Sequence, residues 1–79
     1  MVYTYRMRED PLRDEQGIEW KVYGIEAVDS AGNILCCFPD IFFDRERAKA
    51  FVRSCNVQRV ELLHMQDVID NVLAEQYTP

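Results

Sequence analysis

The residues of this sequence that could bind a metal ion or carry redox chemistry are three cysteines and one histidine: Cys36, Cys37, Cys55 and His64. Zinc sites usually separate paired cysteines by about two to four residues, so that both sulfurs reach one ion. Cys36 and Cys37 are adjacent, and adjacent residues of a β-strand point to opposite faces. If residues 34–38 form a strand, these two thiols cannot face the same ion or pocket. We therefore interpret the cysteines as small apolar side chains, and we expect no metal and no other cofactor.

A second constellation is His64, Asp67 and Asp70, which are spaced three residues apart at the expected start of a helix. His64 and Asp67 could touch, and together they could hold a metal ion or act as a base. This alternative makes the chain a small ligand- or metal-binding domain or an enzyme. The simpler interpretation is that acidic residues in a first helical turn favour the positive end of the helix dipole. No nucleophile, oxyanion donor or glycine-rich phosphate loop accompanies these residues, so we do not expect an enzyme.

Three basic residues, Arg45, Lys49 and Arg53, recur every fourth position and would form one stripe on a helix. Such a stripe could contact an anion or an acidic partner. Alternatively, it is a solvated face, with some arginines pairing with the acidic residues that follow Val60. The sequence leaves both interpretations open.

The formal net charge of the 79-residue chain is −5, which argues against general binding to nucleic acids and to anionic membranes. The longest wholly apolar run, Ile34 to Phe38, is too short to cross a membrane. The first ten residues, MVYTYRMRED, lack the apolar segment of a signal peptide. The odd number of cysteines also argues against a disulfide framework. We therefore expect a single cytoplasmic domain spanning residues 1–79.

Three strands are expected in the first half of the chain, at about residues 2–8, 18–29 and 34–38. The first alternates apolar and polar residues, as a half-buried strand does. Residues 9–17 contain Pro11 and Gly17 and are expected to be a long exposed connection. In the second strand the apolar positions change parity at Gly24, which predicts a β-bulge there. Pro39 is expected to end the third strand, because proline has no N–H to donate.

Two helices are expected in the second half, at about residues 45–56 and 63–76. Asp44 is a good N-cap for the first helix and Asn56 a plausible C-cap. The apolar positions of each helix fall on one face. They are Ala48, Phe51, Val52 and Cys55 in the first, and Met65, Val68, Ile69, Val72 and Leu73 in the second.

The order of elements predicts an α+β domain: a three-stranded antiparallel β-meander followed by two helices packed on one face of the sheet. Both parities of the second strand carry apolar residues, and two helices cover only one face. Some apolar side chains are therefore expected on an open face: Trp20, Tyr23, Ile25, Leu35 and Cys37. Large exposed apolar patches usually mark protein contacts. We expect a non-enzymatic protein-interaction or regulatory module, whose partner is a second copy or another protein. Alternatively, the bulge and a strong twist turn much of this surface inward.

From Tyr23 onward the chain resembles domain-of-unknown-function family 6514, a family of short bacterial proteins. The matching pieces are Tyr23 to Glu26, Asp40-Ile41, Asp44 to Glu46, Asn56, Leu63 to Met65 and Asp67 to Asp70. Phe42 and Asn71 depart from the family pattern, in which a small hydroxyl residue and an acid are common at these positions. The resemblance implies a small cytoplasmic protein of low-GC Gram-positive bacteria and implies no activity. It also suggests that His64 and Asp67 belong to a shared helix-start motif.

Overall fold

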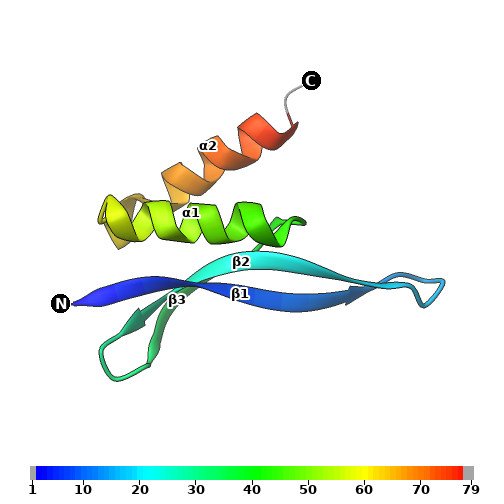
Figure 1. Ribbon diagram of the computed structural model, residues 1–79, viewed down its shortest axis with the longest axis horizontal. Helices are drawn as coiled ribbons and strands as arrows, with labels where there is room; N and C mark the ends of the chain where they lie inside the picture. Colours follow the sequence, from blue (N-terminus) through cyan, green and yellow to red (C-terminus); the bar gives the residue numbers. More distant parts are fainter. Residues whose placement is uncertain (1, 78–79) are drawn as a thin grey trace.

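A computed structural model describes residues 2–77 of the chain. Its elements, in order, are β1 (Tyr3–Arg13), β2 (Glu19–Asp29), β3 (Ile34–Phe42), α1 (Arg45–Val57), a short 3₁₀ helix η1 (Leu62–His64) and α2 (Met65–Tyr77). The strands form one antiparallel sheet in the order β1-β2-β3. Both helices lie on the same side of this sheet (Figure 1). The predicted α+β class, with three strands followed by two helices, is confirmed.

The hydrophobic core lies between the sheet and the helices. On the sheet side, Tyr5 of β1 and Ile25 and Ala27 of β2 are buried, and Tyr3 and Met7 pack against them. The alternation predicted for the first strand is therefore confirmed. The helices contribute their apolar stripes, of which Ala48, Cys55, Met65 and Ile69 are fully buried. Phe51, Val52, Val68, Val72 and Leu73 are half-buried against the same core.

Strand β1 is longer than predicted, because it continues through Pro11 to Arg13. The expected exposed connection shrinks to a turn, in which the Asp14 carboxylate accepts hydrogen bonds from the N–H groups of Gln16 and Ile18, both at 2.9 Å. Pro11 is tolerated because β1 is an edge strand. The Tyr5 N–H points to the outer edge of β1. The direction of the backbone N–H alternates from residue to residue along a strand. Pro11 is an even number of residues from Tyr5, so its nitrogen also faces outward. No sheet hydrogen bond is lost there.

Strand β3 also passes through its proline, and Gly24 explains how. Tyr23 pairs with Phe42 but Ile25 pairs with Phe38, so three residues of β3 bulge opposite the single residue Gly24. A Cβ atom on Gly24 would collide with the Phe38 carbonyl oxygen and lie 2.8 Å from the Pro39 Cα. The bulge at Gly24 is confirmed, but the extra residues belong to β3.

The apolar side chains of β2 are predicted to switch from one face of the sheet to the other at Gly24. This switch does not occur, because β2 keeps an unbroken register with β1. Val22 and Tyr23 therefore point to opposite faces, yet they are only 3% and 8% exposed. Residues 22–28 are buried on both faces of the sheet. The central part of the second face is thus closed by neighbouring strands and side chains.

The predicted start of α1 is confirmed, since the Asp44 carboxylate accepts the N–H of Glu46 at 2.9 Å. The predicted C-cap is wrong. Asn56 lies within α1, and Gln58 follows as the cap. Asn56 instead bonds to the backbone of β1 through its side chain. At the start of the second helix, η1 holds His64 and α2 begins at Met65.

Candidate functional site

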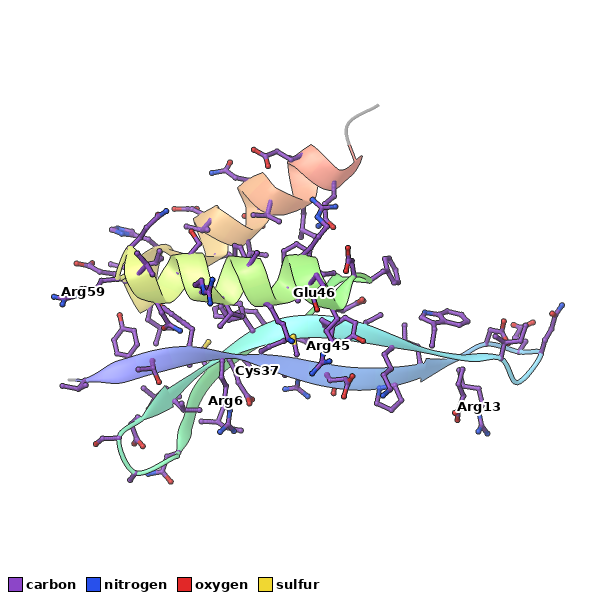
Figure 2. All side chains as sticks on the ribbon, in the orientation of Figure 1. Arg6, Arg13, Cys37, Arg45, Glu46 and Arg59 are labelled. Carbon is purple, nitrogen blue, oxygen red and sulfur yellow. The ribbon has the colours of Figure 1, made fainter. Side chains whose placement is uncertain are left out.

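The sheet face turned away from the helices carries a cluster of charged side chains from β1 and β2. Arg6 and Glu26 are paired across the strands, with Nε 2.6 Å from Oε1. Arg8 donates from Nε and Nη2 to the Asp10 carboxylate at 2.7 and 2.8 Å. Its Nη1 contacts the sulfur of Cys37 on β3. Arg8 lies opposite Gly24 on β2, so its guanidinium crosses β2 to reach β3. Arg6 and Cys37 are labelled in Figure 2.

The charges of this cluster neutralise one another. The Glu26 side chain is 9% exposed, and Arg6 compensates its charge. The hydrogen bonds from Arg8 lower the pKa of Asp10, and Asp10 in turn raises the pKa of Arg8. Two guanidinium groups thus face two carboxylates. The arrangement holds the sheet together and leaves no unpaired charge to bind a substrate. Sequence reasoning missed it, because the pairing depends on strand register.

The three cysteines lie in separate environments. Cys36 aligns with Ala27 and Tyr5 on the helix-facing side, whereas Cys37 contacts Arg8 on the opposite face. The expectation that the two adjacent thiols point to opposite faces is confirmed. Cys55 is buried between α1 and the sheet, and burial raises the pKa of its thiol. Within residues 2–77, no three His, Cys, Asp or Glu side chains gather in a way that could hold a metal ion.

The structure does not build a site from His64, Asp67 and Asp70. His64 is exposed in η1, and its Nδ1 lies 3.9 Å from the Glu61 carboxylate. Asp67 and Asp70 are exposed on α2, where Asp70 accepts a hydrogen bond from Gln66. The three side chains line neither of the two pockets described below.

The basic stripe is exposed on the outer surface of α1, as Arg45, Lys49 and Arg53 all lie in the solvent-accessible positions of the helix. A shallow groove of about 560 Å³ runs along this surface. It is lined by Glu46, Lys49, Ala50, Arg53, Ser54 and Val57. Lys49 lies 3.8 Å from Glu46, and across residues 2–77 no ion pair joins α1 to α2. The arginines of α1 therefore do not use the acids of α2 as partners.

The residues expected on an open sheet face fall into two groups. Tyr23 and Ile25 are buried under the helices, because β2 does not change side at Gly24. They are not available to a partner. Trp20 and Leu35 are 40% and 37% exposed, and Cys37 is half-buried.

The most exposed part of the sheet is the far end of the β1–β2 hairpin. Strand β3 pairs with β2 only between Tyr23 and Val28, so residues 9–21 form a two-stranded extension, here called the arm. The arm projects beyond the helices (Figure 1). Leu12 lies directly opposite Trp20 on it, and Ile18 follows the turn. Leu12 and Ile18 are 39% and 56% exposed. Sequence analysis missed Leu12 because residues 9–17 were expected to be a loop.

A second shallow pocket, of about 480 Å³, lies between the start of β1 and the end of α1. Three of its polar side chains already serve the fold. Asn56 bonds to the Tyr5 backbone, the Tyr5 hydroxyl donates to the Val60 carbonyl at 2.7 Å, and the Tyr3 hydroxyl accepts the Leu62 N–H at 2.8 Å. We interpret this pocket as the junction that fixes α1 to β1.

Residues 1–75 match a family whose description reads "Family of unknown function (DUF6514)". The chain belongs to the DUF6514 family. The match confirms the resemblance seen from Tyr23 onward and extends it to the start of β1. No curated protein and no solved structure matches the chain.

The DUF6514 description assigns no activity, so the function of this family member has to be argued from its own surfaces. Among residues 2–77, no helix has the length and apolar character that a membrane crossing requires. Among the exposed features of residues 2–77, the apolar arm and the basic groove on α1 are candidate contact surfaces.

Proposed function

We propose that this DUF6514 protein is a non-enzymatic protein-interaction module of the cytoplasm that associates with itself through the arm of its sheet. The observation that carries the proposal is the exposed trio Leu12, Ile18 and Trp20 on a hairpin end that no helix covers. Tryptophan is over-represented among the residues that dominate binding energy at protein interfaces. Burying one large apolar side chain contributes about 2 kcal/mol.

The arm itself also favours a partner. An isolated two-stranded hairpin is marginally stable in water, and the arm has neither a third strand nor a helix behind it. A domain of this size also buries too little surface for a large stability margin. Contact with a second copy would stabilise the arm and add to the core at the same time. The cytoplasmic location is supported by the cysteines, since all three are free thiols.

The test is molar mass by light scattering across a dilution series that reaches millimolar concentration. We expect the mass to rise with concentration, and Trp20→Ala or Leu12→Ala to weaken the association about tenfold or more. Leu63→Ala is the matched control, because Leu63 is 84% exposed on η1 and lies outside the arm. A chain that stays monomeric throughout, or an association equally sensitive to Leu63→Ala, would rule out the arm as a self-contact.

A further inference from the structure

The arm and the groove on α1 carry opposite charges. Residues 9–21 contain five acidic and two basic side chains, a formal charge of −3. Residues 45–59 contain five basic side chains and one acidic one, a formal charge of +4. The two segments therefore attract each other. Complementary electrostatic potentials on two surfaces speed their association and orient them.

The two surfaces also match in their apolar parts. In the groove, Ala50 and the 75%-exposed Val57 are accompanied by Lys49 and Arg53. In the arm, Leu12, Ile18 and Trp20 are accompanied by the carboxylates of the turn, Asp14 and Glu15, whereas Glu19 is paired with Arg13. Each surface thus combines apolar side chains with charges of a single predominant sign.

Their lengths agree as well. From Glu46 to Val57 the helix rises about 16 Å, at about 1.5 Å per residue. The β1 half of the arm, Glu9 to Arg13, extends about 13 Å, at about 3.3 Å per residue. One side of the arm therefore fits within the groove and covers most of its length.

The arm of a chain cannot reach the groove of the same chain. Strands β1 and β2 direct it along the long axis of the molecule, past the helices (Figure 1). The hairpin would have to bend back on itself to contact the outer surface of α1. Any contact between arm and groove is therefore made between two molecules.

We infer that the groove on α1 binds the arm of a second copy of this chain. Leu12, Ile18 and Trp20 of one copy pack on Ala50 and Val57 of the other, while the carboxylates of the turn, Asp14 and Glu15, face Lys49 and Arg53. This inference rests on the proposed self-association and names the surface that receives the arm. Because part of the attraction is between exposed charges, the association weakens as salt is added.

The experiment is a charge exchange within one chain, read out as the dissociation constant for self-association by light scattering. Arg53→Glu and Glu15→Arg each bring like charges together and are expected to weaken association about tenfold. The double variant Arg53→Glu/Glu15→Arg restores opposite charges in every arm–groove contact, and we expect it to recover most of the affinity. Circular dichroism checks that each variant is folded.

Arg47→Glu is the matched control. It makes the same charge change on the same helix, at a residue that does not line the groove and instead stacks over the Phe42 ring. We expect it to weaken association much less than Arg53→Glu does. Equal effects of the two variants, or no recovery in the double variant, would overturn the inference.

The proposed function and this inference fail in different ways. If Trp20→Ala abolishes self-association while Arg53→Glu and added salt leave it unchanged, the arm binds elsewhere on the second copy. In that case the inference is wrong and the proposed function stands. If the unmodified chain is monomeric at every concentration, both are wrong.

Discussion

The side-chain amide of Asn56 forms two hydrogen bonds with the backbone of Tyr5. The Tyr5 N–H donates to Oδ1 and Nδ2 donates to the Tyr5 carbonyl oxygen, both at 2.8 Å. The amide thereby takes the place of a neighbouring strand at the outer edge of β1. It fixes α1 to the sheet. It also occupies a backbone N–H and a carbonyl group at the sheet edge, which could otherwise pair with a strand of another chain.

Replacing Asn56 with alanine is expected to lower the free energy of unfolding by about 1–2 kcal/mol, the value of two hydrogen bonds near the surface. Alanine has a higher helix propensity than asparagine, and this gain offsets part of the lost stability. Urea unfolding measures the change. Asn71→Ala on the exposed side of α2 is the control and should be neutral or slightly stabilising. Equal stabilities of the two variants would show that the Asn56 bonds contribute nothing.

Gly24→Ala is expected to destabilise the protein severely, by about 3 kcal/mol or more, because the new methyl group meets backbone atoms of Phe38 and Pro39 that cannot move independently. Gly32 supplies the contrast. It has a φ of +87°, and a Cβ there meets nothing within 4 Å. Gly32→Ala should cost only about 1 kcal/mol, the price of the left-handed backbone. Thermal unfolding of both variants checks the ranking, and a milder effect at Gly24 would contradict the bulge geometry.

Stability should decline at alkaline pH because of Tyr5. Burial, and then the neighbouring Tyr3 hydroxyl, raises the pKa of Tyr5 above its ordinary value of 10.0. The folded state therefore keeps a proton that the unfolded chain releases. The resulting stabilisation is complete below about pH 10 and is lost as the pH rises towards the pKa of the folded state.

The variant Tyr5→Phe isolates this effect. It removes the hydrogen bond to the Val60 carbonyl and should cost about 1 kcal/mol at neutral pH. The difference in unfolding free energy between the variant and the unmodified protein should then shrink above about pH 10. Urea titrations at pH 7 and at alkaline pH measure it. A difference that stays constant with pH would exclude Tyr5 as the titrating group.

The Arg6–Glu26 ion pair should contribute more to the free energy of unfolding than the solvent-exposed Arg13–Glu19 pair on the arm. Arg6→Met leaves the nearly buried Glu26 carboxylate uncompensated, and we expect a loss of about 1–2 kcal/mol, reduced because Arg6 itself is 53% exposed. Arg13→Met breaks an equivalent cross-strand pair with Glu19, whose side chains are 67% and 61% exposed, and should have no measurable effect. A double-mutant cycle with Glu26→Gln gives the coupling energy, and a value near zero would contradict the prediction.

The elements that depend on local sequence could be predicted. Asp44 caps α1 because a side-chain oxygen there reaches an N–H two residues away. The helical stripes follow from apolar spacing alone. The end of β1 could not be predicted, because Pro11 reads as a strand breaker until one knows that its nitrogen faces outward on an edge strand.

The surfaces were harder to predict than the elements, because they depend on register and on distant contacts. Trp20, Tyr23 and Ile25 are all predicted to lie on the open face. Only Trp20 is exposed, whereas Tyr23 and Ile25 belong to the core. The pairing of Arg6 with Glu26 needs the alignment of two strands, which no spacing within either strand reveals. Asn56 reads as a helix cap, and its actual partner lies 51 residues away.

The hydrogen bonds that join Tyr3 and Tyr5 to the segment from Asn56 to Leu62 span 51 to 59 residues. During synthesis the first strand leaves the ribosome long before the residues that complete its bonds. The three strands can pair with their sequence neighbours early, but their helix-facing side stays uncovered until the helices have been synthesised. The sheet therefore passes through a period in which its apolar side is open to chaperones or to other chains.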